Sequence, residues 1–327
     1  MPSVLNTAVA TGAGFNQLVN ATRDVFSAEL WFAALPVLKF DQFSTKKTEL
    51  GVQPGKTIQI PKYGNLKRGG ALVEGVRLQT KSMSLSLAPL TVGESGNAIG
   101  FSEYLLQTSF YDQLSAASLL LGRDMALVLD SQLRDIAITA TNVIFGGGKA
   151  TRILVLAADV FSTVTIKDAV EVLETNNAPK FGGDHYVCFL HPHQARKLRD
   201  DSGWINASLY AGVTQIYTGE IGRYEDVRFV TTTVMPNGAN NAVDSTTGDF
   251  ADPGFDNALR TGVAGNQTNV YRALFLGEYS YGHATALPVE LRDNGVEDFG
   301  REHGLAWYAI WGQALLETAN SVLAETA

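Results

Sequence analysis

The chain has 327 residues and a net charge of −8, and its composition is 45% hydrophobic and 18% charged. These values are typical of a folded protein that can bury a sizeable core and divide into two lobes, and they exclude wholesale disorder. The acidic balance argues against a body that wraps nucleic acid, since counterion release needs a surplus of Lys and Arg. It suits a container whose inner wall must not adhere to a polyanion.

The first part of the chain predicts a tail and a helix. Residues 1–14 are small and polar, and they lack the charged start and continuous apolar core of a secretory signal. A helical period of apolar residues then predicts a helix from Phe15 to Leu38 that stops near Pro36. No window approaches the roughly eighteen consecutive apolar residues of a membrane span, so we expect a soluble intracellular product.

A long hairpin is predicted next. Apolar residues stand at every second position at Ile58 and Ile60, and again at Met83, Leu85 and Leu87. Serines occupy the positions between the last three. This alternation predicts two strands, each with one face that can be buried and one face that meets water.

The segment between these strands, from Gly64 to Thr80, is rich in glycine and basic residues and has too little hydrophobic material to pack on its own body. A segment of that length in a compact domain is normally functional or reaches towards a partner. We interpret it as an arm that gains its contacts from another subunit, through Lys67, Arg68, Gly69, Gly70, Glu74 and Arg77. A solvated loop and a nucleic-acid contact are the alternatives, although no aromatic residue except Tyr63 could stack on bases.

The strongest helical pattern runs from Tyr111 to about Thr139, after a strand region predicted over residues 89–102. Ser109 with Asp112 resembles a capping box. The apolar residues that keep to one face are Leu114, Leu121, Met125, Val128, Leu129, Leu133 and Ile136. At about 1.5 Å per residue the helix would be about 43 Å long, which suits a spine along the subunit.

The second half of the chain predicts shorter elements. In chain order they are a helix from Ile166 to Thr175, a strand from Tyr186 to Leu190, a helix that starts after Pro192 and runs to about Arg199, a turn and an alternating strand over 219–234, a surface loop over 236–268, a strand from Tyr271 to Ser280, and a strand from Leu305 to Leu316 that passes into a last strand or short helix. This order predicts two lobes, the second inserted between the early and late parts of the first.

A glycine-lysine run, Gly146 to Lys149, invites a phosphate-loop interpretation that fails twice. Val143 stands where the motif needs glycine, and Ala150 replaces the Ser or Thr that would bind magnesium. We expect the run to act as a soft hinge instead. No pair of carboxylates and no nucleophile motif is recognisable, so we expect neither an enzyme nor a cofactor.

Three histidines, His185, His191 and His193, could offer metal ligands. No acidic residue stands at ligand spacing beside them, and Pro192 constrains the backbone, so we predict a turn between strand and helix and no metal. A metal-dependent hydrolase built on this cluster is an alternative. The single cysteine, Cys188, allows no intrachain disulfide, and we expect a buried thiol.

Four blocks in order resemble the major capsid proteins of tailed bacteriophages, in particular the N-four-like podovirus family. They are GKTIQIPKYGNL (55–66), ALVEGV (71–76), the run from Leu121 to Asp130, and GEIGRYEDVRF (219–229). The resemblance covers most of the chain from about residue 30, and 236–268 looks like an insertion.

This resemblance implies the α+β, Hong Kong 97-like phage capsid fold. Its parts would be an N-terminal arm over 1–50, an extended loop over 51–90, a peripheral domain over 91–182 with a spine helix over 110–140, an axial domain over 183–285 with the surface loop 236–268, and closing strands of the peripheral domain over 286–327. Lys67 is suitably placed for a cross-link known in this fold, but no partner Asn is marked, so that chemistry is not carried over.

The resemblance also implies a coat protein that assembles into pentamers and hexamers of an icosahedral shell around a double-stranded DNA genome, without specific DNA recognition. Arg123, Asp130, Arg134, Arg223 and Glu225 are further expected inter-subunit contacts, and Asp130 and Arg134 are expected to pair on the solvent side of the long helix.

The expected partners are other copies, a separate scaffolding protein because no long N-terminal extension is present, a portal and, as an open case, a decoration protein. The expected location is the virion, after assembly in the host cytoplasm. An encapsulin-like nanocompartment shell is the alternative with the same fold.

Overall fold

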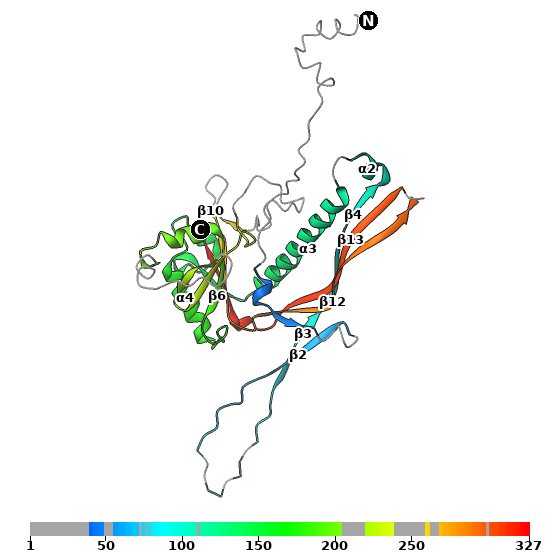
Figure 1. Cartoon of the computed structure of the whole chain (residues 1–327). Helices are drawn as coiled ribbons and strands as arrows, with labels where there is room; N and C mark the ends of the chain where they lie inside the picture. The colour runs from blue at the N-terminus through cyan, green and yellow to red at the C-terminus, as the bar shows by residue number, and fades with distance from the viewer. Residues whose placement is uncertain are drawn as a thin grey trace, which may run out of the picture. The chain divides into compact units, whose positions relative to one another are not determined.

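The computed structural model describes residues 39–48, 55–71, 74–75, 77–78, 80–109, 112–204, 220–238, 259–261, 268–298 and 301–327. All of them belong to one compact unit, Leu35–Ala327. The helix predicted from Phe15 to Leu38 lies outside the described residues, as do most of the N-terminal arm predicted over 1–50 and most of the loop predicted over 236–268. Figure 1 shows the described elements.

A four-stranded sheet contains the longest strands of the described residues. Its order is β1–β12–β13–β4, and these strands span, in that order, Thr45–Lys47, Tyr281–Glu297, Glu302–Leu315 and Gly93–Ser102. Strands β12, β13 and β4 are antiparallel, and β1 is parallel to β12. Alternate residues of β13, from Leu305 to Trp311, are buried, which is the period of two that a half-buried strand requires.

The helix α3, Gln113–Ala137, packs on this sheet through the buried side chains of Ala117 and Leu121. The indole nitrogen of Trp307 donates to Asp124 at 2.8 Å, and that of Trp311 donates to Gln132 at 2.8 Å. Each buried indole thereby finds a polar partner on the helix, as a buried tryptophan requires. The predicted long helix is confirmed.

The start of α3 differs from the prediction. Asp112, and not Ser109, is its N-cap, and the Asp112 carboxylate accepts from the amides of Leu114 and Ser115. Ser109 instead follows the short helix α2, Glu103–Thr108, as its C-cap. An acidic side chain at an N-cap satisfies otherwise unpaired amides. Asp112 therefore caps the helix alone, whereas the predicted capping box assigned this task to Ser109 and Asp112 together.

The second large sheet of the described residues has six strands. Its order is β5–β14–β11–β6–β8–β7, and these strands span, in that order, Asn142–Phe145, Ser321–Thr326, Tyr271–Leu276, Tyr186–Leu190, Val227–Thr231 and Glu220–Tyr224. The pairs β5/β14 and β6/β8 are parallel and the other pairs are antiparallel. The segment predicted as a turn and one strand over 219–234 is thus a hairpin of β7 and β8.

Strand β6 is continuously apolar because both of its faces are buried. Tyr186, Cys188 and Leu190 pack in one buried cluster with α4, Thr163–Thr175, and α5, Pro192–Arg199. The alternate residues Val187 and Phe189 pack in a different cluster. A strand covered on both faces has no polar face to display. The predicted bounds of β6 and the predicted end of α5 are confirmed, and so is the burial of Cys188; α5 begins at Pro192, one residue earlier than predicted.

The segment Lys39–Lys47, which includes the short helix η2 (Asp41–Phe43), joins α3 to both sheets. Phe40 stacks on Phe189 of the six-stranded sheet at 4.3 Å, and its carbonyl accepts from the Tyr281 hydroxyl of β12 at 2.6 Å. Asp130 of α3 accepts through Oδ1 from the amides of Lys39 at 3.1 Å and Phe40 at 2.8 Å.

The prediction of a solvent-side pair between Asp130 and Arg134 is therefore wrong. Asp130 is 1% exposed, because the segment that begins at Lys39 covers this face of the helix. The Arg134 guanidinium donates to the carbonyl of Val234 at 2.7 Å and pairs with Asp135 at 2.6 Å. A carboxylate that caps distant backbone amides has the same local spacing as a surface ion pair, so the sequence pattern could not separate the two.

Two further expectations differ from the structure. The residues 286–327, expected to close one lobe, are divided between the sheets, because β14 lies inside the six-stranded sheet. Two of the glycines expected to form a soft hinge are closely packed: a Cβ on Gly146 would lie 2.6 Å from the Asp159 carbonyl oxygen, and Gly147, with φ 64°, also lies against Asp159. The close contact with Asp159 and the positive φ require glycine at these positions, so chain flexibility is not needed to explain them.

The remaining described strands are short or belong to the hairpin treated below. Strands β9, Arg260–Thr261, and β10, Thr268–Asn269, pair with each other. Among the helices that the structure describes, none is long and apolar enough to cross a membrane.

Candidate assembly surface

The β2–β3 hairpin is fixed at its root to the four-stranded sheet. Strand β2, Thr57–Tyr63, pairs antiparallel with β3, Leu85–Thr91, over their whole length. Leu90 is fully buried with Ala284 of β12. Gly312 of β13 lies so close to β3 that a Cβ there would stand 2.1 Å from the Thr91 carbonyl oxygen. Lys62 forms an ion pair with Glu317. The root is therefore a packed attachment.

Beyond this root the chain continues as the arm, defined here as residues 64–84. Every described residue of the arm is exposed. The Gly64 amide donates to the Ser84 carbonyl at 2.9 Å, and the Lys81 ammonium donates to the carbonyls of Lys67 and Arg68 at 2.8 Å each. Figure 1 shows the two limbs of the arm leaving β2 and β3 as an open loop.

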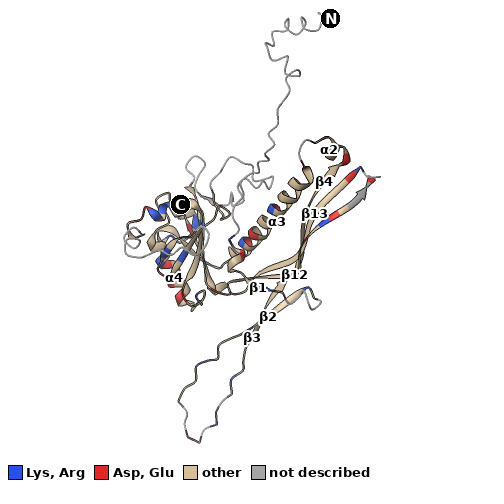
Figure 2. Cartoon of the chain, in the orientation of Figure 1, with Lys and Arg blue, Asp and Glu red and all other residues tan. Residues whose placement is uncertain are grey.

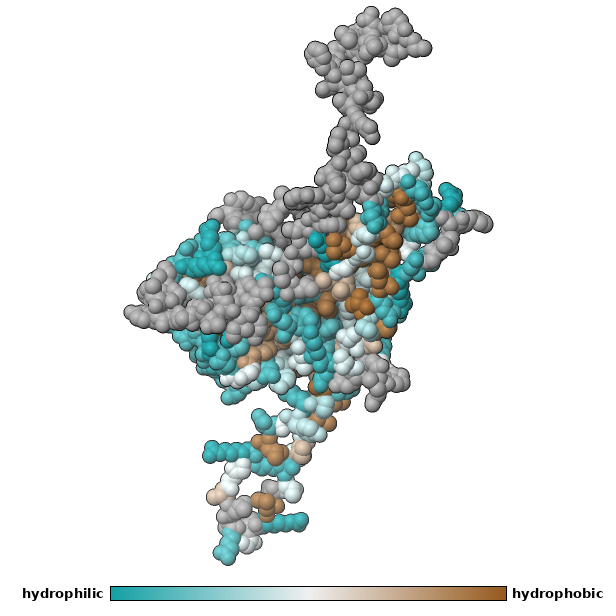
Figure 3. All heavy atoms as spheres, in the orientation of Figure 1, coloured by the Kyte–Doolittle hydropathy of each residue, from teal (hydrophilic) through white to brown (hydrophobic). Residues whose placement is uncertain are grey.

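Large apolar side chains of the hairpin are exposed. The exposed fractions are 64% for Tyr63, 60% for Leu66, 65% for Leu78, 70% for Met83, 54% for Leu85 and 54% for Leu87. Figure 3 shows hydrophobic groups on this projecting part. The predicted burial of the face with Met83, Leu85 and Leu87 does not occur within one chain, because no second described layer covers it. Six large apolar side chains exposed on one hairpin make it a candidate interaction surface.

The hairpin is also the basic part of an acidic chain. Residues 55–91 contain six Lys or Arg and one Glu, a net charge of +5, so the rest of the chain carries −13. Lys67, Arg68 and Arg77 are exposed and form no ion pair with another described residue. Figure 2 marks basic positions along both limbs. The hairpin therefore carries basic charge beside its exposed apolar side chains.

Sequence reasoning missed a second exposed apolar group on α2 and the start of α3. Its members and exposed fractions are Tyr104 79%, Leu105 42%, Leu114 52%, Leu119 45% and Leu120 46%. Leu114 was expected on the packed face of the helix. The signal was the run Leu119–Leu121: three consecutive helical residues span about 200° of the helix surface, so they cannot all face one sheet.

The structure does not bring the remaining expected contact residues to the arm. On α3, Arg123 is half-buried, Asp130 is buried, and Arg134 is engaged by Val234 and Asp135 as described above. Asp130 in particular presents no surface to a partner.

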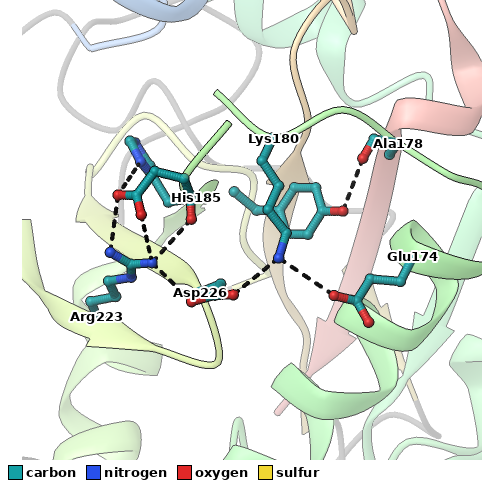
Figure 4. A network of polar contacts seen from close by, with 8 residues as sticks. Glu174, Ala178, Lys180, His185, Arg223 and Asp226 are labelled. Atoms are coloured by element: carbon teal, nitrogen blue, oxygen red, sulfur yellow. Dashed lines mark hydrogen bonds and ion pairs between the residues drawn. The ribbon is translucent and has the colours of Figure 1, made fainter. Parts of the chain in front are cut away.

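Arg223 and Glu225 lie at the β7–β8 hairpin, and Arg223 belongs to the polar network of Figure 4. The Arg223 guanidinium donates to Asp184 at 3.0 Å and to Asp226 at 2.8 Å, and Asp226 accepts from Lys180 at 3.0 Å. The hydrogen bond from Lys180, followed by that from Arg223, lowers the pKa of Asp226. Arg223 is thus engaged within its own chain, whereas Glu225 is exposed.

Glu225 and Asp226 form the turn of this hairpin with φ of 47° and 58°. Two successive positive φ values are the geometry of a type I′ turn, which glycine and asparagine adopt more readily. The ion pairs on Asp226 fix one of the two residues in that conformation.

His191 and His193 of the histidine cluster have structural roles. His191 is the N-cap of α5 and accepts from the His193 amide at 3.2 Å, while Gln194 completes a capping box. Burial lowers the pKa of His191 to about 4. His193 stacks on Tyr271 at 4.4 Å. The predicted turn between strand and helix is confirmed, and no group of three His, Cys, Asp or Glu within the described residues could hold a metal ion.

A family model described as phage capsid protein matches residues 136–316. Among solved structures, the capsid of Ralstonia phage GP4 is similar with a TM-score of 0.68 at 17% identity, over 93% of this chain and 94% of that one. The cyanophage Pam1 capsid is similar with a TM-score of 0.72 at 15% identity, over 96% and 99%. The capsid of cyanophage P-SCSP1u is similar with a TM-score of 0.67 at 15% identity, over 94% of each chain. None of the curated proteins matches.

Proposed function

The chain belongs to the phage capsid protein family, and from this premise we propose that its arm is the element through which one copy holds the next in the shell. The expected α+β, Hong Kong 97-like fold is confirmed, and the chain is a phage major capsid protein. The family is one of structural proteins, and its capsid neighbours do not favour the encapsulin-like alternative.

The exposed surface of the hairpin carries this proposal. Six large apolar side chains, each more than half exposed, stand on a hairpin with a rigid root and a charge opposite to that of the remaining chain. Burying apolar area contributes about 25 cal/mol per Å², and the paired root of β2 and β3 limits the chain entropy that is lost when the hairpin binds. Many such contacts, each weak alone, make a closed shell stable collectively.

Finer features of the function are part of the same proposal. The copies would form pentamers and hexamers of an icosahedral shell around double-stranded DNA in the virion, after assembly in the host cytoplasm. A scaffolding protein and a portal would take part, an N-four-like lineage fits the four sequence blocks, and a decoration protein stays open. The six-stranded sheet would be the axial domain, with β5 and β14 added, and the four-stranded sheet with α3 the peripheral domain.

Electron microscopy of the chain expressed with its neighbouring genes tests the proposal. We expect closed icosahedral particles that contain DNA and no cargo enzyme. The double variant Lys67→Glu and Arg68→Glu should fold, as circular dichroism would show, but should form no closed shells. A matched control is Arg196→Glu with Lys197→Glu on α5, another adjacent basic pair, which should assemble. Normal particles from the arm variant would refute the role given to the arm.

A further inference from the structure

One edge of the six-stranded sheet is open beside a groove. Strand β5 is the first strand of the sheet, and among the described strands it pairs only with β14. A groove of about 540 Å³ runs along it, lined by β5, by the turn of residues 148–150 and by α4. An open edge presents unpaired backbone amides and carbonyls, which is a template for a further strand.

The helix α4 contributes one stripe of side chains to this groove. The stripe holds Asp168, Glu171, Val172, Thr175 and Asn176. Their spacing of i, i+3, i+4, i+7 and i+8 places them on a single helical face. The groove is therefore a strip bounded by a strand edge on one side and a helix face on the other.

The groove is lined by apolar side chains and by acidic side chains that form no ion pair with a described residue. Val172 and Ile144 are half-buried against the core, and Val143 is 37% exposed. Asp168 and Glu171 are exposed and form no ion pair with a described residue. The one basic group in the lining, Lys149, lies 4.0 Å from Asp159, so its charge is offset by a residue outside the lining.

These properties fit an extended, basic segment that carries an occasional large apolar residue. The limb Gly64–Gly70 of the arm has that chemistry: Leu66 is 60% exposed, Lys67 and Arg68 are exposed, and the strand ladder of the hairpin has ended before it. We propose that the limb Gly64–Gly70 of a second copy lies in the groove between β5 and α4 and adds a strand to the open edge. This rests on the proposed function, since it names the surface that receives the arm.

The spacing of side chains supports the match. In a strand Leu66 and Arg68 point to the same face, about 6.6 Å apart along the chain. On α4, Val172 and Asp168 are one turn apart, about 6 Å along the axis. Leu66 can thus contact Val172 while Arg68 reaches the carboxylate of Asp168 or Glu171, and Lys67 points to the other face. Backbone pairing would supply affinity, and the two side-chain contacts would supply register, as in other strand additions.

A charge swap tests this assignment in the full chain. Arg68→Glu alone and Glu171→Arg alone should each lower the yield of closed shells about tenfold, whereas the two together should restore most of it. Glu94→Arg, which reverses an exposed glutamate of β4, is the matched control and should assemble normally. Circular dichroism on each purified chain confirms that losses arise in assembly.

A cysteine pair gives a second readout. Leu66→Cys with Val172→Cys should yield disulfide-linked chains from oxidised shells, and the native Cys188 is fully buried and cannot compete. Shells without such links, together with normal assembly of the Glu171→Arg variant, would overturn the groove assignment. If Arg68→Glu still blocks assembly in that case, the arm keeps its proposed role and only its receiving surface is wrong. If Arg68→Glu and the double variant Lys67→Glu with Arg68→Glu both assemble normally, the proposed function is overturned.

Discussion

Replacing Asp130 by Asn should remove a pH dependence from the stability of the chain. Asp130 is 1% exposed, and although Oδ1 accepts from two backbone amides, Oδ2 has no hydrogen-bond partner. Burial raises its pKa to about 6 from an ordinary 3.8, and the hydrogen bonds from Phe40 and Lys39 only partly oppose this. The folded chain therefore favours the protonated form of Asp130 more than the unfolded chain does.

The sign and the size of the effect follow from this difference. Above pH 6 the buried carboxylate lowers the free energy of unfolding, and this penalty disappears as the pH falls below about 4. A shift of about 2 pKa units amounts to about 3 kcal/mol at pH 7.5, and about 1 kcal/mol of it remains at pH 4.5. Asparagine keeps an acceptor for the two amides and carries no charge. The wild-type chain should thus gain about 2 kcal/mol relative to Asp130→Asn between these pH values.

Denaturant unfolding of the unassembled chains at pH 7.5 and pH 4.5 measures this change. Other titrating groups are common to both proteins and cancel in the difference. Asp135→Asn, at a side chain that is 58% exposed on the same helix, is the control and should shift by less than about 0.5 kcal/mol between the two pH values. A wild-type minus Asp130→Asn difference that is the same at both pH values would refute the reasoning.

Two further substitutions probe the core and the arm. Glu325 is fully buried and accepts from Arg152 at 2.6 Å and from Arg272 at 2.9 Å. Glu325→Gln should therefore lower the free energy of unfolding by about 3 kcal/mol in denaturant titrations. A loss below about 1 kcal/mol would contradict the ion-pair account. Leu85→Ser with Leu87→Ser should change the unfolding free energy of the free chain by less than about 1 kcal/mol but abolish closed shells, because these side chains are 54% exposed before assembly. Unchanged shells in electron micrographs would contradict the second expectation.

Local patterns were sufficient where the structural cause is local. The strand Tyr186–Leu190 has the bounds that the sequence predicts, and the helix Pro192–Arg199 differs from its prediction only by one residue at its start, because an apolar run, a proline and a cap act within a few residues. The long helix was predicted from its apolar period, and only its cap was misassigned. The burial of Asp130 could not be predicted, because its partners stand about ninety residues earlier in the chain.

The candidate site was predicted in part for a similar reason. Glycine content and basic charge identified the arm, but the exposure of Leu85 and Leu87 depends on whether the same chain supplies a covering layer, which alternation along a strand does not reveal. Arg223 looked available because one of its acidic partners, Asp184, stands 39 residues earlier in the chain and meets it only in the folded sheet. The groove beside β5 likewise arises from strand order.

Hydrogen exchange of the backbone amides of residues 64–84, in free chains and in closed shells, tests most directly whether a second copy covers the arm. Apart from the Gly64 amide, the described amides of the arm lie beyond the β2–β3 ladder, so they should exchange rapidly in the free chain and about a hundredfold more slowly in the shell. The amides of β6 are the internal reference and should be protected in both states. Equally fast exchange of the arm in free chains and in closed shells would contradict the account.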